Sequence, residues 1–294
     1  MSGAVSGAVS DPRLTPANGR VAHVSLKGQV AAERYTEGTW RQVETGVLPL
    51  LDAPDGSRTR ELLQGERFCV LDQGDGFAFG FAGRDGYVGW VFEEFLFPEQ
   101  PPTHRVNAIR SNWQEEPDIK RAMRLFPLSF GARVRVARIE GAWAKLAIQT
   151  PPDAVWFREA WMPAVHLAPV DSLETDPVAV AEKFLGTPYL WGGNSAFGID
   201  CSGLVQAALH TCGLNCPGDS DMQQTLGEDA TGGAQRGDLI FWKGHVAMVV
   251  DADRLIHANA GHMAVAYEGI DTAIRRIAAL GEGPVIARRR VRVG

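Results

Sequence analysis

A cysteine stands where this sequence predicts that a helix begins. Cys201 follows Asp200 and precedes Ser202-Gly203, and apolar residues at helical spacing predict a helix from about Cys201 to Thr211. A cysteine at a helix N-terminus lies at the positive end of the helix dipole, which favours the nucleophilic thiolate. We therefore expect Cys201 to be a catalytic nucleophile.

Two downstream histidines could supply the base that this nucleophile needs. His245 opens the run His-Val-Ala-Met-Val-Val and His257 lies in Leu-Ile-His-Ala-Asn, and both runs are typical of β-strands. Two adjacent antiparallel strands could place both rings on one face, where one ring acts as general base and the other orients it. A lone cysteine is usually a buried hydrophobe and a lone strand histidine is usually structural, but the three residues together favour a Cys-His-His site.

The other cysteines, Cys69, Cys212 and Cys216, are interpreted as small buried hydrophobes. Four cysteines in 294 residues are too few for a disulfide scaffold. Cys212 and Cys216 form a C-x-x-x-C pair near His210, but a structural zinc site needs four ligands and the sequence offers no second pair. We expect neither a metal nor an organic cofactor.

The segment that carries these residues predicts an α+β domain in which helices precede strands. Asp176-Pro177 begins a helix over Val178 to Leu185, because proline is favoured in the first helical turn. A Gly-rich loop over residues 186–198 separates this helix from the one that begins at Cys201. Strands are expected at residues 238–242, 245–250, 255–258 and 285–291.

Short strands separated by Gly and Asp turns precede this domain and predict two small β-barrels. Gln100-Pro101-Pro102 forms a stiff joint between them, since consecutive prolines favour an extended path. We expect a mobile tail over residues 1–20, barrels over 21–99 and 103–170, and a catalytic domain over 172–294. The expected strands are 21–26, 45–51, 67–71, 76–80 and 86–92 in the first barrel and 105–109, 133–139, 142–148 and 156–162 in the second.

The composition excludes several classes of function. A formal net charge of −6 argues against a nucleic-acid partner, whose phosphates need a basic face. The sequence holds no run of about 18 apolar residues, so no membrane span is expected. Residues 1–20 lack the basic and apolar regions of a secretory signal, and we therefore expect a cytoplasmic protein.

Four motifs in the C-terminal segment resemble those of the NlpC-type (NlpC/p-sixty) cell-wall cysteine peptidases. The resemblance covers about residues 176–290 and implies a papain-like fold that cleaves peptidoglycan stem peptides. It implies that Cys201 is the nucleophile, His245 the general base and His257 the polar third member. The motifs are Gly186-Thr-Pro-Tyr-Leu-Trp-Gly-Gly193, Gly198-Ile-Asp-Cys-Ser-Gly203, Gly237-Asp-Leu-Ile-Phe241 and Gly244-His-Val-Ala-Met248.

The same resemblance implies an oxyanion site beside the nucleophile. Tyr189 matches a family tyrosine near the oxyanion, and the backbone N–H of Cys201 is a second donor there. Asp200 and Ser202, which flank the cysteine, are included among the candidates for oxyanion and substrate binding.

The two β-barrels resemble tandem bacterial SH3-type (SH3b) domains, and the whole order is similar to the YkfC subgroup of γ-D-glutamyl-L-diamino acid endopeptidases. In that subgroup the first barrel closes one end of the groove, and the substrate has a free N-terminal L-Ala. The resemblance implies that Asp219-Ser220 contact this end of the substrate and that Tyr87 contributes from the first barrel. It also implies an acidic residue from that barrel, for which Glu61 and Glu66 both remain candidates.

The sequence therefore predicts a papain-like α+β peptidase domain preceded by two all-β SH3b barrels. The expected partner is a murein-derived peptide, which the enzyme cleaves through an acyl-enzyme during murein recycling. One alternative is an N-acetylmuramoyl-L-alanine amidase, which the first barrel and Asp219-Ser220 disfavour because an amidase must leave the sugar end open. A second alternative is a non-enzymatic wall-binding module, which the intact Cys-His-His set disfavours.

Overall fold

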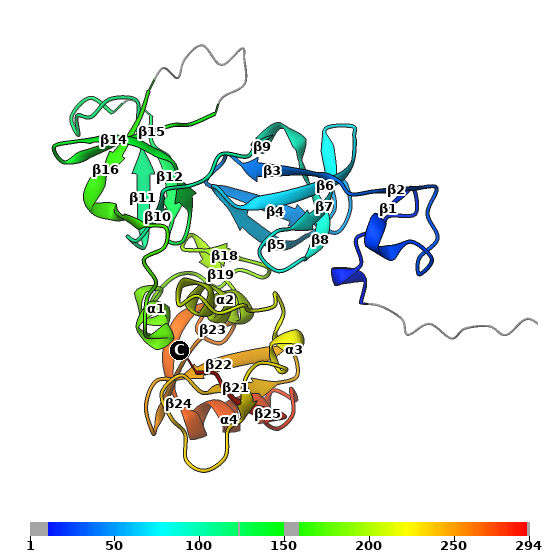
Figure 1. The fold of residues 1–294 in the computed structure, drawn as a ribbon. Coiled ribbons are helices and arrows are strands. Elements are labelled where there is room, and N and C mark those ends of the chain that lie inside the picture. The colour runs from blue at the N-terminus through cyan, green and yellow to red at the C-terminus, as the bar shows by residue number, and fades with distance from the viewer. Residues whose placement is uncertain (1–10, 123, 150–158, 293–294) are drawn as a thin grey trace, which may run out of the picture. The chain divides into compact units, whose positions relative to one another are not determined.

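The chain divides into two compact units between Pro101 and Pro102, inside the proline joint that the sequence predicts. The structure, a computed structural model, describes residues 11–122, 124–149 and 159–292. Figure 1 labels the helices and strands of each unit. No helix in the described ranges is both long and apolar enough to cross a membrane.

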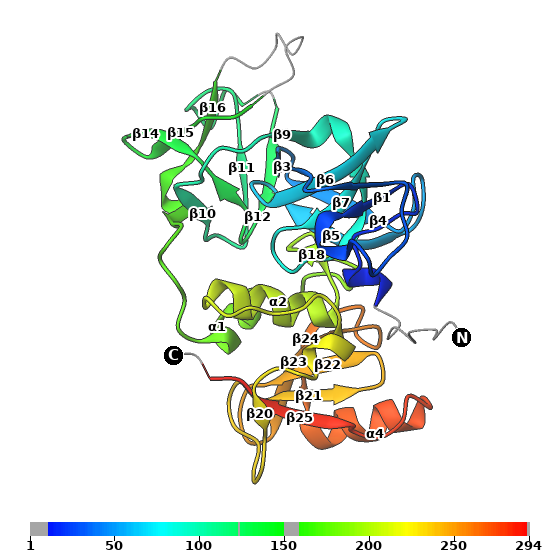
Figure 2. The same cartoon turned by 45° about the vertical axis from the view of Figure 1, so that its right-hand side comes forward.

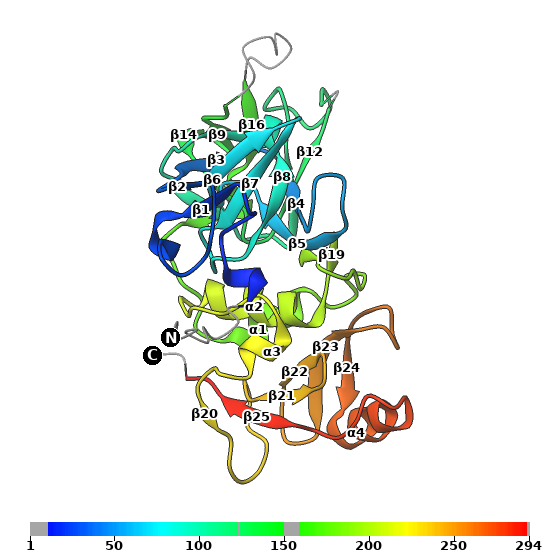
Figure 3. The same ribbon diagram turned by 90° about the vertical axis from the view of Figure 1, so that its right-hand side faces the viewer.

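The first unit is built on one seven-stranded antiparallel sheet (Figure 3). A two-residue hairpin of type I′ needs positive φ at both turn positions, and Asp75 (φ 54°) and Gly76 (φ 82°) supply it between the sixth and seventh strands. A two-stranded parallel sheet of β1 (Val21–His23) and β2 (Arg34–Thr36) adds to the unit. The seven strands, in sheet order, are β5 (Arg58–Leu63), β4 (Val47–Leu51), β8 (Val88–Phe92), β7 (Phe77–Ala82), β6 (Arg67–Gly74), β3 (Thr39–Val43) and β9 (Leu96–Pro98).

The structure corrects the expected mobile tail for residues 11–20, while residues 1–10 lie outside the described residues. Asp11 caps a short 3₁₀ helix over Pro12–Leu14, and the Asn18 side chain accepts a hydrogen bond from the Val21 N–H. Val21 is fully buried in a small core with Cys69, Leu71 and Phe79. Cys69 and Leu71 lie on one face of β6 and pack with Val21, whereas Phe68 and Val70 on the other face belong to the larger core of this unit.

Several first-unit strands differ from their expected limits. The strand expected at 21–26 ends at His23, because Val24–Leu26 turns into a 3₁₀ helix capped by the His23 ring. Four of the strands given above, β2, β3, β5 and β9, were not predicted from the sequence. Arg58–Leu63 has no clean alternation, since its last four residues are all buried.

The second unit begins with three small sheets between residues 104 and 169 (Figure 1). The strand expected at 133–139 is divided at Arg135 into two strands of different sheets, and the second of them has a register irregularity between Val136 and Arg138. Residues 156–158 of the last expected strand lie outside the described residues. The sheets are β13 (Arg133–Val134), β10 (His104–Val106) and β17 (Leu167–Pro169); β11 (Arg110–Trp113) and β12 (Phe126–Ser129); and β14 (Val136–Glu140), β15 (Trp143–Leu146) and β16 (Ala160–Pro163).

The rest of the second unit begins with helices and ends in a sheet, as expected, but one further helix lies between its last two strands. Asp176 accepts a hydrogen bond from the Val178 N–H and Pro177 occupies the first turn of the first helix. The elements are α1 (Pro177–Lys183), β18 (Asn194–Ser195), β19 (Gly198–Ile199), α2 (Cys201–Thr211), α3 (Ser220–Gln223), β20 (Glu228–Asp229), β21 (Leu239–Trp242), β22 (His245–Val249), β23 (Arg254–Asn259), β24 (Ala264–Gly269), α4 (Ile270–Ala279) and β25 (Ala287–Arg290).

A six-stranded antiparallel sheet in the order β20-β25-β21-β22-β23-β24 separates two hydrophobic cores. Alternate residues face opposite sides, so Leu239 and Phe241 of β21 join the core under α1 and α2. Ile240 and Trp242 join the core under α4 instead. Figure 2 shows α1 and α2 on one side of this sheet and α4 on the other.

The second β region and the helix–sheet region are joined by specific contacts. Phe130 belongs to the core under α1 and α2 and packs edge-on against Phe184, with ring centroids 5.7 Å apart. The Ser129 hydroxyl accepts a hydrogen bond from the Ala196 N–H (2.9 Å), and Arg110 Nε donates to the Ala196 carbonyl (2.8 Å). These contacts hold the β18–β19 turn, which precedes α2.

Candidate active site

Asp200 fixes the start of α2 and, with it, the position of Cys201. Its Oδ1 accepts hydrogen bonds from the Gly203 N–H (2.6 Å) and the Ser202 hydroxyl (3.0 Å). Its Oδ2 accepts one from the Gly192 N–H (3.0 Å), which ties the Gly-rich loop to the helix. Cys201 is 6% exposed in the first turn, where the unpaired N–H groups of a helix converge.

Gly203 lets the Gly-rich loop and α2 approach closely, so a larger residue at this position should destabilise the fold. A Cβ at Gly203 would lie 2.4 Å from the Gly193 carbonyl oxygen, which is backbone and cannot rotate away. Alanine improves helix propensity by about 1 kcal/mol over glycine, but overpacking of this kind costs about 1–3 kcal/mol or more. We expect Gly203→Ala to lower the urea midpoint of unfolding. Ala207→Gly, at a half-buried position of the same helix, is the control for the propensity difference. A stabilised Gly203→Ala would contradict the close approach.

The two histidines meet on neighbouring strands, which confirms the expected strand pairing. His245 begins β22 and His257 lies in the middle of β23, and these strands are antiparallel neighbours. His245 Nε2 lies 2.9 Å from His257 Nδ1, within hydrogen-bonding distance. Because this contact occupies Nε2, Nδ1 is the ring nitrogen of His245 that remains for a thiol.

Glu268 and Arg276 extend this chain of side chains. Glu268 lies on β24 two residues beyond the Ala266 that faces His257, so it shares the face of His257. Its Oε2 is 3.1 Å from His257 Nε2, although the contact is poorly aligned for a hydrogen bond. Arg276 of α4 donates to both carboxylate oxygens, at 2.9 and 2.8 Å.

Burial keeps both histidines neutral at pH 7. Removal from water lowers the pKa of His245 to about 4, and the positive charge of Arg276 acts in the same direction. Burial and the neighbouring His245 lower the pKa of fully buried His257 to about 3. Burial alone would raise the pKa of Glu268, but the hydrogen bonds and charge of Arg276 keep it below its usual value. A neutral His245 can accept a proton, as a general base must.

The depressed histidine pKa values predict that acid destabilises this fold. Each histidine protonates near 6.5 when unfolded and near 3 to 4 when folded, so the unfolded chain binds more protons between these values. The contribution of the two histidines to the free energy of unfolding is therefore fully present above about pH 6.5, and it is lost as the pH drops toward 4. At about 1.4 kcal/mol per pKa unit, the loss is on the order of 3 kcal/mol for His245. Urea unfolding of wild type and His245→Asn at pH 7 and pH 5 checks this prediction. The free energy of unfolding should fall more between these pH values in wild type than in His245→Asn, and equal decreases would contradict it.

Tyr189 is positioned beside the start of α2. It forms a parallel bridge with Ile199, two residues before Cys201, and its N–H bonds to the Met263 carbonyl (2.9 Å). Burial raises its pKa well above the usual value, and negative charge at Cys201 and Asp200 adds to this effect. The phenol therefore stays protonated and can donate a hydrogen bond.

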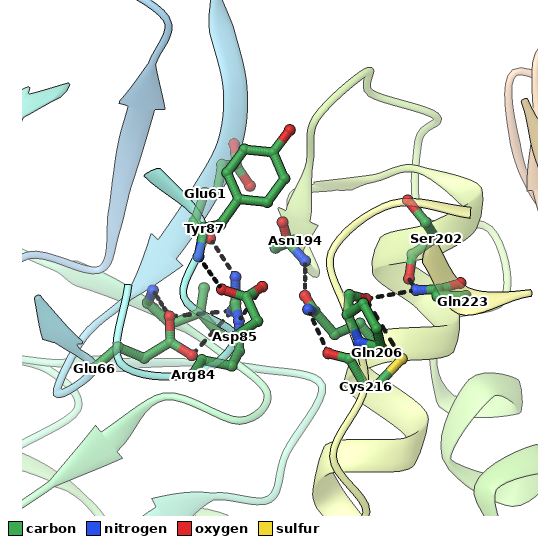
Figure 4. Close-up of polar contacts among 12 residues, drawn as sticks. Glu61, Glu66, Arg84, Asp85, Tyr87, Asn194, Ser202, Gln206, Cys216 and Gln223 are labelled. Atoms are coloured by element: carbon green, nitrogen blue, oxygen red, sulfur yellow. Dashed lines mark hydrogen bonds and ion pairs between the residues drawn. The ribbon is translucent and has the colours of Figure 1, made fainter. Parts of the chain in front are cut away.

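Asp219 and Ser220 begin α3, and glutamines tie this short helix to α2. Gln223 Nε2 donates to the Ser202 carbonyl (3.0 Å) and to the Pro217 carbonyl (2.9 Å). Figure 4 shows the contact of Gln223 with Ser202. It also shows two further hydrogen bonds, in which Asn194 Nδ2 donates to Gln206 Oε1 (3.0 Å) and Gln206 Nε2 donates to the carbonyl of Cys216 (3.0 Å). The loop that carries Asp219 is therefore fixed relative to the nucleophile helix.

The first-unit candidates cluster around one arginine of that unit. Arg84 Nη1 donates to both oxygens of Glu66 (2.9 and 3.1 Å), and Glu66 Oε2 also accepts from the Leu63 N–H (2.9 Å). Glu61, on β5, has its carboxylate 3.6 Å from Arg58 and its backbone carbonyl bound by Arg84 (Figure 4). Tyr87 is 5% exposed and belongs to the core of this unit. The Glu66 carboxylate therefore stabilises the turn between β5 and β6 and holds the Arg84 side chain.

Sequence reasoning missed the residues that hold the site in place. Glu268, Arg276, Gln206 and Gln223 were not singled out, although each contacts a predicted site residue or its immediate support. The signal for Arg276 was available, because Ile270, Ala273 and Ile277 follow the spacing of an amphipathic helix. Among the described residues, one ligand atom each of His257, His262 and Glu268 could hold a metal ion.

The chain carries an NlpC/P60 domain preceded by a bacterial SH3 domain of the dipeptidyl-peptidase type. Residues 186–276 match the NlpC/P60 family and residues 50–96 match the bacterial dipeptidyl-peptidase Sh3 domain. This confirms the family that the four sequence motifs indicated. NlpC/P60 is a cysteine peptidase family that acts on peptidoglycan, so the family also confirms the expected class of enzyme.

Two relatives that this chain matches carry peptidase names. The chain is 31% identical over 134 residues to dipeptidyl-peptidase 6 of Lysinibacillus sphaericus, which covers 44% of this chain and 49% of that protein. It is 27% identical over 192 residues to the γ-D-glutamyl-L-lysine dipeptidyl-peptidase of Bacillus subtilis, covering 59% and 60%. The matches therefore span about half the length of these relatives.

A solved NlpC/P60 family protein from Bacillus cereus shares the fold over most of the chain. The two structures superpose with a TM-score of 0.72 over 86% of this chain and 99% of the other, at 20% sequence identity. The expected fold is thus confirmed as an NlpC/P60 domain that follows an SH3-type domain in a mostly β N-terminal region.

Proposed function

We propose that this protein is a γ-D-glutamyl-L-diamino acid endopeptidase that cleaves murein stem peptides with a free N-terminal L-Ala. The observation that carries the proposal is the pair of neutral histidines, His245 half-buried and His257 fully buried, which lie within hydrogen-bonding distance on the sheet against which the Cys201 helix packs. The family match and the names of the relatives support the same reaction class.

The proposed reaction begins with proton transfer from the Cys201 thiol to His245 Nδ1. The thiolate attacks the γ-carbonyl carbon of D-Glu, and the resulting oxyanion accepts hydrogen bonds from the Cys201 N–H and the Tyr189 phenol. Protonated His245 then gives its proton to the leaving amine of the diamino acid. Water, deprotonated by His245, attacks the thioester, and the cycle ends with release of L-Ala-γ-D-Glu.

His257 and Glu268 position the base in this scheme. When His245 Nε2–H donates to His257 Nδ1, neutral His257 carries its own proton on Nε2, toward the Glu268 carboxylate. A hydrogen bond at one imidazole nitrogen decides which tautomer the ring adopts. The pair therefore keeps the lone pair of His245 Nδ1 available for the thiol.

The N-terminal barrels and the compartment complete the proposal. We propose two SH3b barrels over residues 21–99 and 103–170, and a papain-like domain over 172–294. We propose that Asp219-Ser220, together with Tyr87 and an acidic residue of the first barrel, recognise the L-Ala end of the peptide. Glu61 and Glu66 are both candidates for this acid, since each already lies near an arginine of its own unit. The enzyme acts in the cytoplasm, where murein fragments are recycled.

The specificity test uses L-Ala-γ-D-Glu-L-Lys with a free or acetylated amine. A carboxylate at Asp219 pairs with the protonated α-amine, whose reference pKa is about 7.7–8.0. Acetylation removes that charge and costs a charge-assisted hydrogen bond of roughly 1.5–3 kcal/mol. We expect kcat/KM to fall by about 10- to 150-fold on acetylation.

Asp219→Asn is the matched variant for this test. It should slow cleavage of the free peptide and leave cleavage of the acetylated peptide nearly unchanged, so that the two kcat/KM values become more similar. Asp221→Asn, two residues further along the chain, serves as a control and should keep the wild-type ratio of kcat/KM between the free and the acetylated peptide. Mass spectrometry identifies the cleaved bond. Equal kcat/KM on both peptides would contradict recognition of the free amine, and release of intact peptide from muramoyl-peptide would identify an amidase.

A further inference from the structure

We propose that His257, His262 and Glu268 form a regulatory site for a divalent zinc-like cation, and that occupation of this site switches the histidine pair off. One ligand atom from each residue lies within 4.8 Å of the other two. Binding of the cation is independent of the proposed function, whereas the inhibition rests on it.

The three residues present the ligand types that zinc prefers. Zinc takes imidazole nitrogens and carboxylate oxygens at about 2.0–2.2 Å in tetrahedral geometry, which places neighbouring ligand atoms about 3.4 Å apart. The present spacing needs closure of little more than 1 Å. His262 supplies that movement, because it is exposed at the tip of the β23–β24 hairpin.

His262 is already oriented as a metal-binding histidine. Asn259 Oδ1 accepts from the His262 backbone N–H (2.9 Å) and lies 3.0 Å from His262 Nδ1. The oxygen therefore favours the tautomer with a proton on Nδ1, which leaves the Nε2 lone pair free. Metal-ligating histidines typically donate their second nitrogen to an oxygen in this way.

His257 supplies the second observation. Its ring is fully buried, and Nε2 has no hydrogen bond of acceptable geometry among the described residues, although Glu268 Oε2 lies 3.1 Å away. A buried ring nitrogen without a well-directed partner is rare. A cation between His257, Glu268 and His262 satisfies it.

Arg276 limits how tightly this cation binds. Its guanidinium holds both oxygens of Glu268, so a cation must share the carboxylate with an existing positive charge. A carboxylate has about four lone-pair sites, two of which remain. Competition with Arg276 for the carboxylate therefore favours reversible binding of a regulatory cation over a resident structural metal.

Occupation of the site reverses the polarity of the histidine pair. When a cation takes the Nε2 lone pair of neutral His257, the ring proton of His257 must be on Nδ1. That proton is donated to His245 Nε2, so the single proton of neutral His245 moves to Nδ1. No proton is gained or lost overall, but His245 then has no lone pair toward the thiol and cannot act as its base.

Zinc chloride titration of the full chain tests the site. Isothermal calorimetry is done on Cys201→Ser, because zinc could otherwise bind the thiol and His245. We expect binding of one zinc ion, weakened at least ~10-fold by a further His262→Ala or His262→Gln change, given that even second-shell losses cost 10- to 100-fold. His104→Ala, a histidine on β10, is the matched control and should bind as Cys201→Ser does.

The activity arm uses the cysteine-containing protein. Zinc should inhibit wild type reversibly with chelator, and His262→Ala should keep its basal rate but lose the inhibition. Absence of zinc binding to Cys201→Ser, or equal affinity after His262 is replaced, would overturn the site. If the chain proved inactive on murein peptides, the calorimetry would still decide the metal site, so the two proposals fail separately.

Discussion

Replacement of Cys201 by alanine is expected to abolish peptide hydrolysis. Loss of a covalent nucleophile removes the acyl-enzyme route altogether, and we expect kcat to fall at least ~10⁴-fold. The fold should survive, because Cys201 occupies the first turn of α2 and alanine is the best helix former. Hydrolysis of L-Ala-γ-D-Glu-L-Lys measures the rate, and urea unfolding checks the fold.

Cys212→Ala is the matched control for this substitution. Burial raises the pKa of both Cys212 and Cys69 to about 11, so these thiols are protonated and poorly reactive at pH 7. Iodoacetamide should therefore label wild type and Cys212→Ala at one site and at equal rates, and label Cys201→Ala far more slowly. Turnover by Cys201→Ala at the wild-type rate would exclude it as the nucleophile.

Removal of His245 is expected to have the next largest effect. A general base typically contributes ~10²- to 10⁴-fold, so His245→Ala should lose at least ~100-fold in kcat/KM. Because burial lowers its pKa to about 4, wild-type activity should persist below pH 6.5 and decline only as His245 is protonated near its lowered pKa. This acid limb should disappear from the residual activity of His245→Ala.

Labelling of Cys201 gives an independent readout of the same residue. The thiol loses its proton acceptor in His245→Ala, so iodoacetamide labelling should slow at pH 7 along with hydrolysis. His104→Ala, outside the histidine pair, should change neither rate. An unchanged labelling rate in His245→Ala would contradict the pairing of thiol and imidazole.

Local signals in the sequence were sufficient for the elements that carry the site. Asp176-Pro177 and Asp200 are helix N-terminal signals, and both helices begin where these residues predict. The runs around His245 and His257 predicted two strands that could place both rings on one face, and His245 Nε2 lies 2.9 Å from His257 Nδ1. These features depend on neighbouring residues, so a single sequence contains them.

Contacts between distant segments could not be obtained in this way. Glu268 lies on β24, whose alternation is weak because Tyr267 is exposed between partly buried neighbours, so this strand was not expected. Helix α4 was missed although its apolar spacing is regular. Arg84, eighteen residues after Glu66, binds the Glu66 carboxylate, and no local pattern in the sequence indicated this contact.

The position of β25 has a consequence for how the second unit forms during synthesis. This strand, Ala287–Arg290, is inserted between β20 and β21, which precede it by about fifty residues. Until β25 has paired with it, the backbone of β21 is an open strand edge that can pair with another chain. When β25 is in place, the Arg290 guanidinium binds both oxygens of Asp238, beside β21 (2.7 Å each). Chains truncated before residue 287 should therefore be aggregation-prone and more easily digested by protease.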